Sequence, residues 1–292
     1  VDAPDSARRF SIPTFRNEVP DSLDAQMIRD AKPVFERREK MQLTYNVRNT
    51  HRAVGTRFSS EITRLYGMKD LAEDHVHVRL RGSAGQSLGA FLCQGITLEV
   101  FGDANDYVGK GLSGGTIIVR PTVSSPLDSQ HNSIIGNTVL YGATSGKLFA
   151  AGQAGERFAV RNSGAHVVVE GCGSNGLEYM TGGIAVILGT VGSNFGAGMT
   201  GGMAFVLDPE GSFASNANPE SIVWQRLESA HWEEQLKSLI MAHAHSTDSA
   251  WSRSIIDDWD RRRGEFWQIC PKEMLTRLAY PLSDKATLEA AE

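Results

Sequence analysis

The sequence predicts a mainly β fold, a right-handed parallel β-helix of about six or seven coils with helical segments at both ends. The first observation is an excess of glycine, at 30 of 292 residues, most of it between Gly82 and Gly211. The second is a repeated pattern there, in which a small or polar residue and a glycine precede a short run of β-branched or aliphatic residues. Strands and glycine bends without a helix in each repeat are typical of a β-solenoid.

The repeat is defined by six aligned glycines, each before a predicted strand. They are Gly95, Gly115, Gly146, Gly164, Gly183 and Gly202. Their spacing is about 19 residues, except in the one long step, where residues 121–132 form a polar, proline-bearing stretch that we interpret as a surface insertion. Each repeat then completes one coil. Its aliphatic side chains fill the interior, and glycine lets the chain bend sharply at the corners.

A solenoid exposes unpaired strand edges at both ends, and these edges need caps. We therefore divide the chain into an N-terminal capping segment at 1–72, the β-helix at 73–209 and a C-terminal helical segment at 210–292.

Within the N-terminal segment, residues 1–20 are polar and predict a linker. The sequence then predicts a helix from Asp21 and, from the alternation of apolar and polar residues at 41–47, a half-buried strand. A second helix is expected to begin at Thr50 and end at Gly67.

In the C-terminal segment the glycine repeat stops after Asp208 and helical spacing returns. Apolar residues share one face over 232–243 and another over 251–259. Pro271 is expected to be the first residue of a last short helix through Leu278.

Composition argues against several classes of protein. The net charge of −5 provides no basic face for nucleic acid, and no apolar run approaches the roughly 20 residues needed to span a bilayer. The three cysteines, Cys93, Cys172 and Cys270, form neither a CxxC pair nor a disulfide framework. A reducing, cytoplasmic compartment is therefore expected.

Two stretches, 109–114 and 196–201, match the dinucleotide-binding pattern G-x-G-x-x-G. That pattern requires a helix after the turn, whereas each stretch here runs into a predicted strand, so we interpret both as glycine corners. His243 and His245 are two apart on a predicted helix and face different ways, which disfavours a zinc site. The sequence therefore assigns no catalytic, cofactor-binding or metal-binding residue.

Polar residues gather at or near the predicted corners. One interpretation is that their side chains satisfy backbone groups freed at the bends. The other is that some form a polar docking face for a neighbouring domain. The candidates are Asp103, Asn105, Asp106, Lys110, Asn137, Glu156, Arg157, Asn162, Asn175, Glu178 and Asn194.

Several long runs resemble the C-terminal domain of glutamate synthase large subunits, called the GXGXG domain. They include GDANDYVGKGLSGG at 102–115, the run at 134–165, EYMTGG at 178–183 and NFGAGMTGGMAFVLD at 194–208. The resemblance implies a β-helix that is a structural part of an enzyme converting L-glutamine and 2-oxoglutarate into two molecules of L-glutamate.

The resemblance also implies partners and cofactors outside this chain. They are the amidotransferase, central and FMN-binding domains of the large subunit, iron–sulfur clusters, and a small subunit that oxidises NADPH. This chain has no N-terminal cysteine nucleophile, no clustered cysteines and no flavin-binding barrel pattern. We therefore expect it to be inactive alone and to hold the glutaminase and FMN domains in position.

Two alternatives remain open. The chain could be a separately encoded subunit that assembles with flavin and amidotransferase chains, although its start at Val1 instead of methionine favours a domain of a longer chain. It could instead be an independent binding module, but the repeat shows no aromatic ladder on a sheet.

Overall fold

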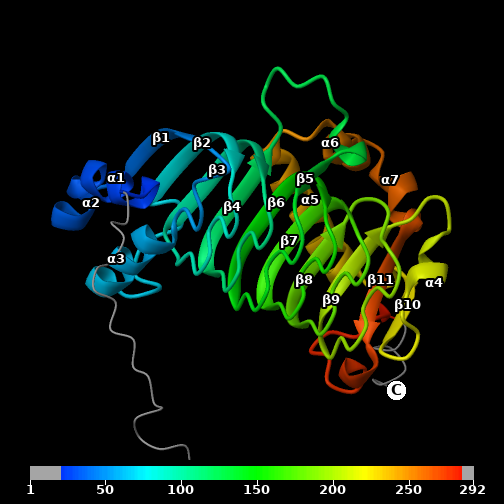
Figure 1. Cartoon of the computed structure of the whole chain (residues 1–292). Helices are drawn as coiled ribbons and strands as arrows, with labels where there is room; N and C mark the ends of the chain where they lie inside the picture. Colours follow the sequence, from blue (N-terminus) through cyan, green and yellow to red (C-terminus); the bar gives the residue numbers. More distant parts are fainter. Residues whose placement is uncertain (1–20, 285–292) are drawn as a thin grey trace, which may run out of the picture.

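The computed structural model describes residues 21–284, so the linker predicted at 1–20 lies outside the described residues. It is a parallel β-solenoid of about seven turns, as predicted, and Figure 1 shows its strands side by side along one rod. The strands follow one another along the sheet in the order β1 (Met41–Val47), β2 (Val76–Ala84), β3 (Ile96–Ala104), β4 (Ser113–Arg120), β6 (Ser145–Ala154), β7 (Ser163–Cys172), β8 (Thr181–Ile187) and β9 (Gly201–Leu207). A short strand, β5 (Ser133–Ile135), pairs with β3 and β6 beside this path.

The strand register sorts side chains into an inner and an outer ladder, because successive residues of a strand point to opposite faces. The inner ladder is apolar and buried; it runs through Leu98, Ile117, Leu148, Val167, Ala185 and Ala204. The next residue of each strand belongs to the outer ladder, which runs through Glu99, Ile118, Phe149, Val168, Val186 and Phe205. Only the outer ladder changes character along the rod, from charged at β3 to apolar beyond it.

Helices cover the apolar part of the outer ladder. Helix α5 (Ala230–Thr247) lies across β4, β6, β7 and β8, and it is followed by α6 (Ala250–Asp257) and α7 (Trp259–Arg262). Leu236, Ile240 and Ile255 from these helices join the outer side chains in a second buried cluster. The predicted helical faces at 232–243 and 251–259 are thus placed against the sheet.

Two strands that the sequence did not predict close the C-terminal end of the sheet, beside the predicted helices. After the short helix α4 (Phe213–Asn216), β10 (Ile222–Arg226) pairs antiparallel with β11 (Phe266–Pro271), and β11 pairs antiparallel with β9. Pro271 therefore ends a strand and does not begin a helix; only a 3₁₀ turn at Lys272–Met274 follows it. Proline is tolerated there because the pairing with β9 stops at Ile269, so no bond to β9 needs its missing N–H.

The N-terminal end holds α1 (Leu23–Asp30), α2 (Lys32–Arg37), β1 and α3 (Thr56–Tyr66). Helix α3 ends at Gly67 as predicted, but it begins at Thr56 and not at Thr50. The reason is a distant cap: the buried Asp24 carboxylate accepts hydrogen bonds from the N–H groups of Gly55, Arg57 and Phe58, at 2.8, 2.7 and 3.1 Å. These N–H groups at the start of a helix have no partner within the helix.

The predicted insertion at 121–132 projects from the rod as a loop (Figure 1) and contains the 3₁₀ turn η2 (Ser129–His131). Among the helices of residues 21–284, none combines the length and the apolar character needed to cross a bilayer.

Candidate functional site: the corner ridge and neighbouring cavities

The corners of the coils form a continuous structure that we call the corner ridge. It consists of the segments 86–91, 106–111, 137–142, 156–161, 174–179 and 193–198. In each segment three alternate residues have positive φ; in one coil they are Arg157, Ala159 and Arg161 at 57°, 55° and 54°. Glycine takes some of these positions, as in Gly109 and Gly111. A left-handed conformation costs a residue with a side chain roughly 1–2 kcal/mol, so something must compensate where glycine is absent.

Hydrogen bonds between coils provide that compensation. The N–H of the first residue with positive φ donates to the following coil, as from Thr138 to the Glu156 carbonyl at 2.8 Å. The N–H of the second donates to the preceding coil, as from Leu140 to the Val108 carbonyl at 2.8 Å. The residues with positive φ in one segment therefore direct their N–H groups alternately toward the following and the preceding coil. Side chains of the second position, such as Leu140 and Leu177, are fully buried.

Four of the predicted polar residues satisfy backbone groups. Asn105 Oδ1 accepts from the N–H of Asp106 at 2.8 Å. Asp106 Oδ1 accepts from the N–H of Asn137, and Asn137 Oδ1 accepts from the N–H of Glu156, both at 2.8 Å. Asn162 is buried, accepts from the N–H of Ala165 and donates to the Ala165 carbonyl, both at 2.9 Å. The structure therefore places these four in the local role that the sequence suggested for corner residues.

Further contacts of the polar candidates are with side chains. Asp103 accepts from Ser83 at 3.1 Å, Asn105 donates to Asn49 at 3.0 Å and Asn194 donates to Asn175 at 2.9 Å. Two more engage neighbours on the ridge: Arg157 pairs with Glu178 at 2.8 Å, and Lys110 lies 6.0 Å from the ring centroid of Tyr107. Glu156 is exposed. Whether Lys110, Glu156 and Arg157 contact another domain stays a prediction.

Sequence reasoning missed a row of exposed aromatic side chains on the ridge. Phe91 is 55% exposed and Tyr179 53%, and Tyr107 and Tyr141 are also exposed. These rings lie at the corners and not on a strand, so a search for an aromatic ladder within the aliphatic runs could not find them. The sequence did contain a signal for two of them. Phe91 and Tyr179 stand at the third positive-φ position of their segments, where other coils have a glycine, such as Gly111 and Gly198. A large aromatic at such a position must lie on the surface.

The predicted structural glycines all stand beside the strand starts, in tight surroundings. Gly183 has φ of +87°, and a Cβ there would collide with the Ala165 carbonyl oxygen. The strand register shows that the six glycines are not all at the same position of the repeat. Four of them directly precede a paired strand residue: Gly115 before Thr116, Gly146 before Lys147, Gly183 before Ile184 and Gly202 before Met203. Gly95 and Gly164 stand one residue earlier in their repeats. The stretches 109–114 and 196–201 lead into β4 and β9, so neither has the helix N-terminus that a phosphate site requires.

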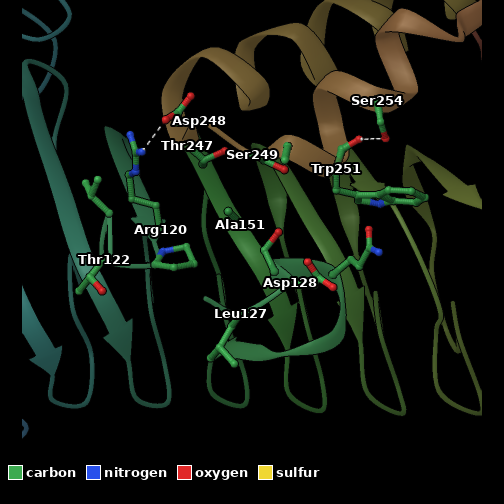
Figure 2. Close-up of a pocket in the computed structure, with 15 residues that line it drawn as sticks. Arg120, Thr122, Leu127, Asp128, Ala151, Thr247, Asp248, Ser249, Trp251 and Ser254 are labelled. Atoms are coloured by element: carbon green, nitrogen blue, oxygen red, sulfur yellow. Dashed lines mark hydrogen bonds and ion pairs between the residues drawn. The ribbon is translucent and has the colours of Figure 1, made fainter. Parts of the chain in front are cut away.

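A cavity of about 410 Å³ lies between the insertion loop and the junction of α5 with α6. Figure 2 shows Arg120 reaching from the sheet toward Asp248, at 3.2 Å, with Leu127 and Asp128 of the loop on the other side. Arg120 also lies 5.4 Å from the ring centroid of Phe101. Its guanidinium is thus already held by two partners.

A second groove, of about 620 Å³, lies between α5 and the outer face of β2 to β7. Its charges are paired: His77 contacts Asp74 at 2.7 Å and Glu99 at 3.0 Å, and Arg79 contacts Glu99 at 3.1 Å. The hydrogen bond to Glu99 raises the pKa of His77 despite burial, with help from Asp74. Burial alone would raise the pKa of Glu99, but the hydrogen bonds from His77 and Arg79 outweigh it and hold that pKa below its usual range.

The cysteines do not fit an iron–sulfur cluster. Cys93 lies in the interior cluster, Cys270 lies in the cluster under the helices, and Cys172 lies at the end of β7. Burial raises the pKa of Cys172 to about 12 and that of Cys270 to about 11, which opposes the thiolate that a metal needs. Within residues 21–284, no group of three or more His, Cys, Asp or Glu side chains could hold a metal ion.

Comparison with known proteins agrees with this architecture. The family model described as "GXGXG motif" matches residues 24–272. The chain is 64% identical over 282 residues to the glutamate synthase [NADPH] large chain of Azospirillum brasilense, which covers 97% of this chain and 18% of that protein. It is 43% identical over 285 residues to the glutamate synthase [NADPH] large chain of Bacillus subtilis, with 97% and 19% covered.

A ferredoxin-dependent glutamate synthase 2 of Synechocystis is 50% identical over 228 residues, which are 78% of this chain and 15% of that protein. The chain thus spans less than a fifth of the length of these relatives. The match of the family model to almost all of the solenoid and its flanking segments shows that the chain belongs to the GXGXG motif family.

Proposed function

We propose that this chain is the structural domain of a glutamate synthase large chain, and that it docks the amidotransferase, central and FMN-binding domains without catalysing a step itself. The parent reaction would be the conversion of L-glutamine, 2-oxoglutarate and reductant into two molecules of L-glutamate. The observation that supports docking most is the row of exposed aromatic rings on the corner ridge. Aromatic and arginine side chains are enriched at protein interfaces, and Arg157 and Arg161 stand in the same row.

The fold suits a spacer between two active sites. Each of the strands β2, β3, β4, β6, β7, β8 and β9 is paired on both sides along the rod, and the corners are linked from coil to coil by backbone hydrogen bonds. Such a stack resists bending, because a hinge would break several ladders at once. A rigid domain of this kind can hold two active sites at a fixed separation, which transfer of ammonia between them demands.

The cofactors of the proposed parent enzyme belong to other parts of it. FMN and iron–sulfur clusters would be bound by other domains, and a small subunit would deliver electrons from NADPH. The high identity to an NADPH-type large chain favours that donor over ferredoxin. The cytoplasm is the compartment we propose, because all three cysteines are free and buried.

Assays of the chain alone test the absence of catalysis. We expect purified residues 1–292 to show a β-rich circular dichroism spectrum, no glutaminase activity, no retained FMN and no glutamate formation. A full-length glutamate synthase large chain in the same assays provides the positive control. Glutamine hydrolysis or bound yellow flavin in the isolated chain would refute the structural role.

A further inference from the structure

A third cavity, of about 190 Å³, lies where the ends of β7, β8 and β9 meet the insertion loop and α6. Glu170 of β7, Trp251 of α6, and Asp208 and Glu210 after β9 line it, together with Gln130 and His131 of the loop. These residues come from four separate segments, so the cavity exists only in the folded chain.

Glu170 is the distinctive group of this cavity. It is 1% exposed. Its Oε1 accepts a 2.5 Å hydrogen bond from Ser249 Oγ and lies 3.4 Å from Nε2 of the buried His243. Among the described residues, no donor reaches its Oε2. Burial of a carboxylate oxygen that accepts no hydrogen bond is costly, so this oxygen is suited to a ligand that brings a donor.

The surroundings favour a positively charged ligand. Asp208 keeps its charge, because hydrogen bonds from Phe213, Trp267 and Ser212 outweigh burial and hold its pKa below the usual range. Glu210 adds a second negative charge at the rim. The basic side chains nearby are His131, which lines the cavity, His243, which lies 3.4 Å from Oε1 of Glu170, and Arg226, which interacts electrostatically with Asp208. Arg262 lies 5.2 Å from the Trp251 ring centroid and is paired with Glu265 at 2.8 Å.

We propose that this cavity binds one organic cation, a primary ammonium or guanidinium group, which donates a hydrogen bond to Oε2 of Glu170 while its carbon chain packs against Trp251 and Leu188. The size agrees, since a cavity of about 150 Å³ can hold a molecule as large as benzene. A metal ion fits less well, because no described cluster of three or more suitable side chains could coordinate it. The cation could be a free amine or a lysine or arginine side chain from another domain.

Titration with two model cations tests the ligand class. n-Butylammonium and n-butylguanidinium should bind to the 292-residue chain with millimolar dissociation constants, on the order of 1–10 mM, as measured by calorimetry. Sodium butyrate and n-butanol, which have the same carbon chain without the positive charge, should not bind. Equal binding of butyrate or butanol, or no heat with either cation, would overturn the proposal.

Variants assign the binding to Glu170. Glu170→Gln keeps the size of the side chain and should weaken n-butylammonium binding at least ~10-fold, because a charge-assisted hydrogen bond is lost. Glu234→Gln, at an exposed position of α5, is the matched control and should bind n-butylammonium as the original chain does. Circular dichroism confirms that each variant is folded. Trp251→Phe tests the packing of the carbon chain independently, and it should weaken n-butylammonium binding by a smaller factor than Glu170→Gln does. Unchanged affinity in Glu170→Gln would contradict the assignment.

The source of the cation is decided in a full-length large chain that contains this sequence. If a free amine is the ligand, n-butylammonium also binds there and Glu170→Gln abolishes the binding. If a basic side chain of another domain fills the cavity, the binding seen in the isolated chain disappears. Either result supports the ligand class, and both are independent of whether the chain is catalytic.

Discussion

The ring of Tyr179 lies over Gly198 of the following coil, so that a Cβ added to Gly198 would stand 2.5 Å from Cδ1 of Tyr179. Phe91 lies over Gly111 in the same way near the other end of the ridge. These glycines have positive φ, as their partners do. Each exposed ring is therefore supported by the backbone of its neighbour, which keeps it at the surface in a defined position.

Gly198→Ala tests this support against a closely matched site. Gly198 and Gly142 have φ of 65° and 66°, but a Cβ at Gly142 would meet nothing within 4 Å. Gly142→Ala should therefore lower the free energy of unfolding by about 1 kcal/mol, the cost of the left-handed backbone alone. Gly198→Ala should cost more, because it also displaces the ring. Urea denaturation measures both, and equal losses would show that the ring does not rest on Gly198.

Gly183→Val tests the bend at a strand start. The new side chain would have positive φ and would collide with the Ala165 carbonyl, so we expect a loss of roughly 2–4 kcal/mol. Gly264→Val is the control, because Gly264 has open space around it and no positive φ. Thermal unfolding compares the two. A melting temperature unchanged by Gly183→Val would show that this corner is not constrained.

The ion pairs on the outer face predict a pH dependence. The pKa of His77 is raised in the folded state, so its contribution is complete below about pH 6.5, the value in an unfolded chain. That contribution is lost as pH rises through the folded pKa. The pKa of Glu99 is lowered, so its contribution is present above about pH 4.3 and is lost as pH falls through its folded pKa.

Stability from this pair should therefore be greatest between these two values. Replacing His77 by Gln should remove the loss of stability on raising the pH from 6 to 9, and replacing Glu99 by Gln should reduce it, since His77 then loses its strongest partner. Urea midpoints measured at several pH values provide the comparison. A slope that persists in both variants would assign the pH dependence to other groups.

The solenoid could be predicted from the sequence because its signals are local. Glycines before aliphatic runs recur at a nearly constant spacing, and each run determines its own strand. The features that could not be predicted depend on distant partners. Helix α3 begins where Asp24, more than thirty residues away, satisfies its first N–H groups. Strand β11 exists because it covers the edge of β9, which lies about 60 residues earlier in the chain. Neither contact leaves a local pattern.

The polar corner residues illustrate the same limit. Asp106, Asn137 and Asn162 were recognisable as corner residues, because Asn and Asp satisfy backbone groups at bends. The aromatic row was recognisable only in part, since Phe91 and Tyr179 share one position of the repeat but Tyr107 and Tyr141 stand at other positions. Only stacking of the coils brings them onto one ridge.

The docking role of the corner ridge is tested most directly in a full-length large chain with both Phe91→Asn and Tyr179→Asn. Asparagine tolerates the left-handed backbone and removes the ring. Met241→Gln, at a residue on α5 that is 53% exposed like Tyr179, is the control. We predict that the double variant keeps glutaminase activity but forms glutamate from glutamine at least ~10-fold more slowly, as loss of one or two interface anchors implies. Glutamate formation equal to that of the control would contradict docking through the ridge.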